Sequence, residues 1–363
     1  MREPKPISIT DVLPELGNSR LEAGNSRFSS ILDARSPGEF AEDHLPEANC
    51  TPVLNDEERI TVGTRYKQSS AFDAKKLGAA LVARNIASLL QAQFHDKPKD
   101  WSPLVYCWRG GNRSGALATI LARVGWPTYI LDGGYREYRR AVLSSFDTLA
   151  GQYQYRVIAG PTGSGKSQIL QKLAASGQQV LDLEDLAKHK GSVLGNLVGQ
   201  PQPSQKYFDT LVAEKLRSFD ISRPVFVESE SKKVGSCQVP DQLITAMRNS
   251  SCIVIEASTP TRVQLLLGEY EHFTTDKVNL FKQLDCLKDL HGKKVIDDWK
   301  ALATNDQWSS FVEATLTQHY DPAYYRSMDR NYQQLPQALL VALNGSNDSD
   351  VKAAADFIIS KQG

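Results

Sequence analysis

The chain has 363 residues, and its 42 lysines and arginines balance 42 aspartates and glutamates, so the formal net charge is zero. This balance excludes a protein that is drawn as a whole to nucleic acid or to an anionic membrane, so any such partner must bind a local patch. The five scattered cysteines argue against a disulfide framework or a zinc site, and the lack of a signal-like N-terminus or of ~20 consecutive apolar residues leads us to expect a cytoplasmic protein without membrane contact.

The first half of the chain alternates short apolar runs with helical patterns. We predict strands over 29–34, 103–108 and 127–134, and helices over 74–93, 114–125 and 135–150. Strands that are separated by helices imply parallel pairing, so this half is predicted to be a layered α/β domain covering residues 1–148.

The second half repeats this alternation. We predict strands over 155–160, 178–185, 223–231 and 251–258, with a helix over 166–176 after the first of them. From residue 260 the patterns are mainly helical. The second domain is therefore predicted over residues 152–363, as a parallel α/β domain with a mainly helical C-terminal part.

The stretch VYCWRGGNRSG, over 105–115, places Cys107 between a predicted strand and a predicted helix. The backbone N–H groups of residues 108–113 can curl around an anion there. Arginines and a helix N-terminus beside a cysteine favour its thiolate, which is the nucleophilic form. We therefore predict that Cys107 is a nucleophile in an anion-binding loop made of Arg109, Gly110, Gly111, Arg113 and Ser114.

The stretch GPTGSGKS, over 160–167, matches G-x-x-x-x-G-K-[ST] directly after an apolar strand and at the start of a helix, which predicts a P-loop NTPase-like domain. Glycines let the backbone N–H groups turn inward, and the helix N-terminus and a lysine add positive charge. Any diphosphate could occupy such a loop, so nucleotide hydrolysis does not follow. The predicted diphosphate-binding residues are Gly160, Gly163, Ser164, Gly165, Lys166 and Ser167.

Two carboxylates lie at predicted strand ends of the second half, Asp182 in VLDLED and Glu228 in VFVE. An acid, a base or a metal ligand is expected at such positions, although ordinary strand-end carboxylates explain them equally well. Ser167 is a candidate ligand of Mg²⁺. We predict no firm metal site and no tightly bound cofactor.

The first loop resembles the rhodanese family, in which the loop cysteine carries sulfur as a persulfide. The resemblance extends upstream to ILDARSPGEFAEDHLPEANCTPV, where His44 is expected to cap a turn rather than to act as a base. The spacing C-x5-R-[ST] from Cys107 to Ser114 also resembles the tyrosine phosphatase loop, which fits a tetrahedral oxyanion. A phosphatase is disfavoured because no general-acid aspartate is evident and because it would not need the second loop.

The combination of both loops is similar to the tRNA 2-selenouridine synthase family, and LNDEERITVGTRYKQ, LDGGYREYR and VESESKKVG extend this resemblance over nearly the full length. The resemblance implies that the sulfur of a wobble 2-thiouridine in tRNA is exchanged for selenium from selenophosphate. It also implies an S-geranylated intermediate made from geranyl diphosphate. Cys107 would carry selenium as an S-selanyl group, Arg109 and Arg113 would hold selenophosphate, and the loop at 160–167 would hold the geranyl donor.

Candidate tRNA contacts are the basic residues of two stretches, Arg136, Arg139 and Arg140 in the first half and Lys232 and Lys233 in the second. Tyr135 and Tyr138 interleave with the arginines, as base-stacking residues do. A solvated helix face would look the same. Two alternatives remain: a sulfurtransferase fused to an ATP-dependent small-molecule kinase, and a noncatalytic RNA-binding module.

Overall fold

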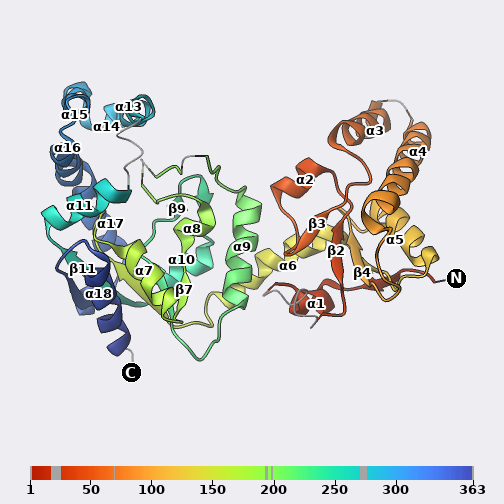
Figure 1. Cartoon of the computed structure of the whole chain (residues 1–363), viewed down its shortest axis with the longest axis horizontal. Helices are drawn as coiled ribbons and strands as arrows, with labels where there is room; N and C mark the ends of the chain where they lie inside the picture. The colour runs from red at the N-terminus through yellow and green to blue at the C-terminus, as the bar shows by residue number, and fades with distance from the viewer. Residues whose placement is uncertain are drawn as a thin grey trace. The chain divides into compact units, whose positions relative to one another are not determined.

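A computed structural model of the chain describes residues 2–17, 26–68, 70–192, 195–197, 199–269 and 276–361. The chain forms two compact units, residues 1–146 with 203–218, and residues 147–202 with 219–363. Each unit contains its own parallel sheet (Figure 1). The predicted α/β class is therefore confirmed, and the segment 203–218 groups with the first unit.

The sheet of the first unit has the strand order β1-β5-β4-β2-β3, and all of its pairings are parallel. Its strands are β1 (Lys5–Ile7), β2 (Ser30–Asp33), β3 (Ala48–Cys50), β4 (Pro103–Tyr106) and β5 (Tyr129–Leu131). The central strand β4 is buried along its whole length, which explains its continuous apolar run. The three predicted strands correspond to β2, β4 and β5, whereas the short edge strands were not predicted.

The helices of this unit lie beside the sheet and carry its connections (Figure 1). They are α1 (Ile9–Val12), α2 (Pro37–Glu42), α3 (Asp56–Gln68), α4 (Ala71–Leu89), α5 (Asn112–Val124) and α6 (Gly134–Leu149). The core between sheet and helices contains Val105 of β4, Leu117 and Leu121 of α5, and the edge-to-face pair Trp101 and Trp126. Helix α5 begins directly after the Cys107 loop, so the core fixes both ends of that loop.

Helix α9 (Gln205–Arg217) belongs to the first unit although it lies far along the chain. Arg139 of α6 pairs with Asp209 of α9 at 2.5 Å, and Arg217 donates to the hydroxyl of Ser145 at 3.0 Å. The side chain of Lys206 pairs with Glu42. These contacts satisfy charged groups of α6 and α2, which is the physical reason that the helix groups with the N-terminal sheet.

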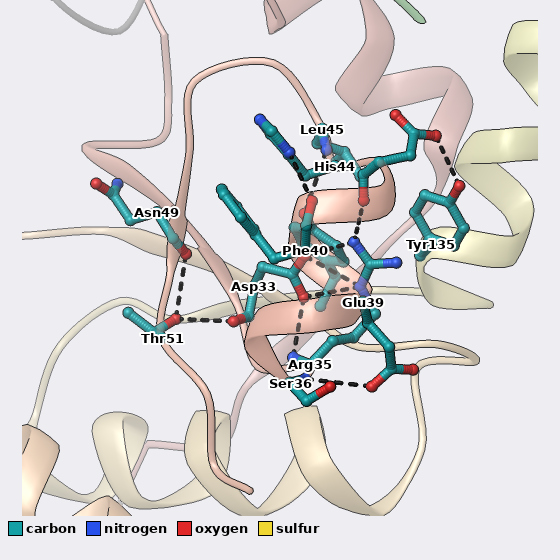
Figure 2. Close-up of polar contacts among 12 residues, drawn as sticks. Asp33, Arg35, Ser36, Glu39, Phe40, His44, Leu45, Asn49, Thr51 and Tyr135 are labelled. Carbon is teal, nitrogen blue, oxygen red and sulfur yellow. Dashed lines mark hydrogen bonds and ion pairs between the residues drawn. The ribbon is translucent and has the colours of Figure 1, made fainter. Parts of the chain in front are cut away.

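A buried ion pair fixes the turn between β2 and α2 (Figure 2). The guanidinium of Arg35 donates to both carboxylate oxygens of Asp33, at 3.0 and 2.6 Å, and both side chains are almost fully buried. The same guanidinium lies 4.0 Å from the ring of Tyr135 and donates to the carbonyl of Asp43. Because every charge is paired, this burial is tolerated, and α2 is held in one orientation beside the Cys107 loop.

The sheet of the second unit has the order β12-β11-β6-β8-β7, again with parallel pairing. Its strands are β6 (Tyr155–Ala159), β7 (Gln179–Leu181), β8 (Val225–Glu228), β11 (Ser251–Ala257) and β12 (Leu339–Leu343), and a small antiparallel pair joins β9 (Lys233–Val234) to β10 (Cys237–Gln238). Helix α7 (Lys166–Ala175) follows β6 through the predicted P-loop. The four predicted strands are confirmed, and β12 was not predicted.

Helices surround this sheet and continue into the helical part predicted after residue 260 (Figure 1). They are α8 (Leu183–Ala187), α10 (Asp241–Arg248), α11 (Thr259–Glu269), α13 (Lys277–Asp285), α14 (Lys288–His291), α15 (Lys293–Thr304), α16 (Trp308–Thr315), α17 (Asp321–Asn331) and α18 (Asp348–Ser360). Among the residues that the structure describes, no helix combines the length and the apolar character needed to cross a membrane.

Candidate active sites

The first candidate site is centred on Cys107, which follows β4 directly and is 3% exposed. The hydroxyl of Ser114, on the first turn of α5, donates a hydrogen bond to the Cys107 Sγ at 3.1 Å. Within the described residues, the backbone N–H groups of residues 109–114 have no hydrogen-bond partner. These amides and the positive end of α5 can therefore bind an anion beside the sulfur.

The start of α6 donates backbone hydrogen bonds to this loop. The backbone N–H of Tyr135 donates to the carbonyl of Cys107 at 2.8 Å, and that of Arg136 donates to Trp108 at 3.0 Å. Gly134 has a φ of +62°, and a Cβ at this position would lie 2.2 Å from the Cys107 carbonyl oxygen. Only glycine permits this approach, which gives the motif LDGGYREYR a structural role.

The carboxylate of Glu39 forms ion pairs with two arginines beside the first site. Arg113 forms a two-pronged ion pair with Glu39 of α2, at 2.6 and 3.2 Å, and Arg59 of α3 approaches the same carboxylate at 2.9 Å. Burial alone would raise the pKa of Glu39, but its hydrogen bonds and charge attraction to Arg113 hold it at about 2. Arg109 is exposed and has no ion-pair partner in the described part of the chain.

The predicted residues of the first site are therefore brought together, with Arg113 positioned by Glu39 and Arg109 left at the surface. The turn-capping contact expected of His44 is present, because its Nδ1 lies 2.9 Å from the carbonyl of Phe40 and its ring stacks on the Phe40 ring (Figure 2). A cavity of about 1160 Å³ opens above Cys107, between the loop and helices α3 and α4.

The second candidate site is the P-loop between β6 and α7. The Nζ of Lys166 lies 3.4 Å from Glu228 Oε1 and donates to the carbonyl of Pro161 at 3.4 Å. The backbone N–H of Gly160 donates to the hydroxyl of Tyr324, on α17, at 2.6 Å. Burial would lower the pKa of Lys166, but the charge of Glu228 opposes it and the pKa is raised. The lysine is thus a full cation in the absence of a ligand.

Three buried glutamates gather beside this loop. Their ligand oxygens lie within 4.8 Å of one another, and the Ser167 hydroxyl lies 3.3 Å from Glu184 and from Glu228. Burial, followed by repulsion from Glu228, raises the pKa of Glu184 to about 10 and that of Glu230 to about 8. Burial also raises the pKa of Glu228. Such a cluster favours either bound protons or a cation.

Of the two predicted acids, Glu228 belongs to this cluster and Asp182 does not. Asp182 is the N-cap of α8, and its carboxylate accepts a hydrogen bond from the backbone N–H of Asp185 at 2.8 Å. Glu184 and Glu230 were missed by the sequence reasoning. Each lies two residues beyond a predicted acid, in DLED and ESES, and this spacing was the available signal.

A cavity of about 410 Å³ extends from the P-loop and has two chemically different sides. One side carries Lys166, Ser167 and the three glutamates. The other is formed mainly by apolar and aromatic side chains of α11, α17 and the segment after α17, namely Leu266, Ala323, Tyr324, Met328 and Tyr332, and the polar side chains of Glu269, His319 and Ser327 also line it. This wall is fixed at both ends, because the Tyr324 hydroxyl contacts Gly160 and the Tyr332 hydroxyl donates to the Glu230 carbonyl at 3.0 Å.

The side chain of Arg262, on α11, joins the P-loop to α17. Its Nε donates to the carbonyl of Thr162 at 2.9 Å, and its terminal nitrogens form a two-pronged ion pair with Asp321. Arg262 is 4% exposed. The apolar wall of the cavity is therefore attached to the phosphate-binding loop by a buried charged pair.

Most of the residues predicted to contact tRNA already pair with carboxylates of this chain. Arg139 is half-buried against Asp209, while Arg136 and Arg140 both pair with Glu137. The stacking role foreseen for Tyr135 and Tyr138 is wrong, because both side chains are buried in the first unit, at 2% and 0% exposure. Lys232 pairs with Asp241, and Lys233 lies exposed on β9.

Comparison with known proteins finds a matching family model in each half of the chain. The rhodanese-like domain family matches residues 14–141, and the family described as the tRNA 2-selenouridine synthase AAA domain matches residues 153–292. The tRNA 2-selenouridine synthase of Nitrosomonas europaea is 36% identical over 264 residues, which cover 71% of this chain and 67% of that protein. That of Shewanella halifaxensis is 30% identical over 329 residues, covering 83% and 89%.

Among solved structures, the N-terminal domain of a putative ATP/GTP binding protein from Clostridium difficile 630 is 30% identical in sequence. The match covers 38% of this chain and 99% of that chain, with a TM-score of 0.32.

Proposed function

The chain belongs to the tRNA 2-selenouridine synthase family, and we propose that it replaces the sulfur of a wobble 2-thiouridine in tRNA by selenium from selenophosphate, through an S-geranylated intermediate. The observation that carries this proposal is the pairing of two anion-binding loops with different surroundings. One loop contains a buried thiol, and the other faces a cavity with an apolar wall. Two consecutive transfers that start from two different anionic donors can use one such site each.

The geranyl step is assigned to the P-loop. The sulfur of 2-thiouridine forms a bond to the first carbon of the geranyl group, the bond from that carbon to the diphosphate oxygen breaks, diphosphate leaves, and N3 of the uracil ring releases its proton to solvent. Lys166 and the loop amides stabilise the charge that develops on the leaving group. The apolar wall that ends at Met328 and Tyr332 supports a hydrocarbon donor, because a chain of ten carbons needs to be shielded from water.

A divalent cation fits beside this loop. The carboxylates of Glu184, Glu228 and Glu230, with the Ser167 hydroxyl, offer the oxygen ligands that Mg²⁺ prefers. A bound cation would neutralise part of the diphosphate charge. It would also bring the glutamates into an ionised state, since a cation replaces the protons that burial otherwise retains.

The selenium step is assigned to the Cys107 loop. Cys107 carries selenium as an S-selanyl group, while Arg109, Arg113 and the loop amides hold the phosphate end of selenophosphate. Forming the sulfur–selenium bond oxidises the selenium by two electrons, which a disulfide co-substrate accepts as water cleaves the selenium–phosphorus bond and phosphate is released. Selenium then bonds to C2 of the uridine as the bond from C2 to the geranylated sulfur breaks and geranylthiol leaves, and a thiol returns the two electrons by cleaving the sulfur–selenium bond.

The test is reconstitution with a tRNA that contains 2-thiouridine at the wobble position. We expect mass spectrometry of the wobble nucleoside to show the S-geranyl product with geranyl diphosphate alone, and the selenouridine after selenophosphate is added. If geranyl diphosphate gives no product and the protein instead hydrolyses ATP or GTP at a rate stimulated by tRNA, the diphosphate assignment is wrong. The sulfurtransferase fused to an ATP-dependent kinase then becomes the better description.

A further inference from the structure

The cavity above Cys107 is much larger than a selenium donor requires. Its volume of about 1160 Å³ lies above the ~300–1,000 Å³ typical of small-molecule pockets. The floor is the loop from Cys107 to Arg113, and the walls are α3 and the first part of α4. A tetrahedral anion at the loop amides leaves most of this space, which Cys107 also lines, open.

The charged residues that line this cavity are all basic, as far as the structure describes its walls. They are Arg59, Lys67, Lys75, Arg109 and Arg113. Glu39 is shared by Arg59 and Arg113, whereas Lys67 and Lys75 have no carboxylate partner in the described part of the chain. The cavity therefore favours a ligand with more than one negative charge.

Helix α3 adds flat and apolar side chains to these charges. Ile60 and Tyr66 line the cavity and are 61% and 56% exposed. No residue of α3 is buried, so packing of the core does not account for the apolar side chains of Ile60 and Tyr66. The helix is nevertheless fixed, because Glu58 accepts from Asn85 of α4 at 2.7 Å and α3 and α4 lie side by side (Figure 1).

A cavity with several cations and exposed flat side chains suits an anionic chain that carries flat groups. Single-stranded RNA has this chemistry, because its bases stack on aromatic rings and its phosphates bind lysine and arginine. We propose that this cavity receives the wobble nucleotide of the tRNA, with its base over Cys107, and that Lys67 and Lys75 bind phosphates beside it. The proposal rests on the proposed function and adds the place of tRNA binding, on the α3–α4 pair rather than on α6.

The first test compares two double variants of equal charge. Lys67→Ala with Lys75→Ala removes two cavity cations, and Lys76→Ala with Lys99→Ala removes two exposed lysines that do not line the cavity. Each phosphate contact to single-stranded RNA contributes ~0.7 to the slope of log affinity against log salt. We expect the cavity variant to lose about 1.4 of this slope for an anticodon stem-loop, and the control to keep it. Equal slopes in both variants overturn the proposal.

A second test does not depend on these lysines. Stacking of one base contributes ~1–3 kcal/mol, so Tyr66→Ala should weaken stem-loop binding by about 5- to 150-fold. A photoreactive thiouridine at the wobble position should crosslink within residues 56–82 or 107–116. Crosslinks confined to α6 or to Lys232 and Lys233 overturn the proposal, while wild-type modification of the same tRNA shows that the proposed function stands independently.

Discussion

The three buried glutamates beside the P-loop predict an unusual dependence of stability on pH. The perturbation is Glu230→Gln, which keeps the shape of the side chain and removes its ionisation. Glu230 has a raised pKa of about 8 because it is buried and close to Glu228. An unfolded glutamate ionises near its ordinary pKa of ~4.3, so between these values the folded state retains a proton that the unfolded state releases.

The sign follows from this difference. The contribution of Glu230 to the free energy of unfolding is fully present below the ordinary pKa. It falls as pH rises, until the folded-state pKa of about 8 is passed. One proton retained only in the folded state costs ~1.4 kcal/mol per pH unit, so at pH 7, about 2.7 units above ~4.3, the free energy of unfolding is lowered by about 4 kcal/mol. Glu184, with a pKa of about 10, adds a second such slope. Lys166, Lys190 and Asp182 are the other charged groups that act on the cluster.

The assay is urea unfolding at several pH values between 6 and 8 in the presence of a chelator, with circular dichroism as the measure of unfolding. We expect the wild-type free energy of unfolding of the second unit to fall with pH, and the Glu230→Gln variant to show a slope that is shallower by ~1.4 kcal/mol per pH unit. Mg²⁺ should stabilise the wild type more at pH 8 than at pH 6, because fewer protons compete for the carboxylates. A slope that Glu230→Gln leaves unchanged would refute the reasoning, whatever Mg²⁺ does.

Three further predictions concern the two transfers. Cys107→Ser should abolish selenium incorporation and leave geranylation intact, as read by mass spectrometry of the wobble nucleoside, since a serine hydroxyl is not ionised near neutral pH; equal loss of both activities in a folded variant would contradict the division of labour. Lys166→Ala should slow geranylation ~10²- to 10³-fold, and a pre-geranylated tRNA should bypass the defect unless the P-loop also serves the selenium step. Selenophosphate labelled with ⁷⁵Se should leave its label on Cys107, whereas retention of ³²P would mean that the thiolate attacks phosphorus, as the C-x5-R spacing of phosphatases suggests.

Both loops could be predicted from the sequence because their functional residues lie within a few positions of one another. A strand, a turn with glycines and a helix were each visible locally, and Cys107 with Ser114, and Lys166 with Ser167, lie where that local order puts them. Periodicity also identified the buried strands β4, β6 and β8, since central strands of parallel sheets are apolar on both faces.

The remaining parts depend on contacts between distant residues, which periodicity does not report. Tyr324 reaches Gly160 across 164 positions, and Glu39 reaches Arg113 across 74. The burial of Tyr135 and Tyr138 was missed for the same reason, because their spacing on α6 is also that of an exposed face. Helix α9 looks like any amphipathic helix of the second half until its charges are seen to pair with α6.

The two anion-binding loops differ in their charge balance, and this difference predicts which of them needs a metal ion. At the Cys107 loop, Arg59 and Arg113 share one ionised carboxylate, Glu39, and Arg109 adds a further positive charge. At the P-loop, two lysines, Lys166 and Lys190, face the three clustered glutamates, and Glu269 lines the same cavity. A diphosphate that enters the second site meets carboxylates that must remain protonated or be neutralised by a cation, whereas a phosphate at the first site meets excess positive charge.

We therefore expect a chelator to abolish binding of geranyl diphosphate, measured by calorimetry near pH 8, and to leave binding of a tetrahedral anion at the Cys107 loop unchanged. Added Mg²⁺ should restore diphosphate binding with release of protons, because the cation displaces those held by Glu184 and Glu230. Buffers of different ionisation enthalpy measure this proton release directly. Diphosphate binding that is equally tight with chelator would show that Lys166 and the loop amides suffice, and the glutamates would then serve as acids or bases rather than as cation ligands.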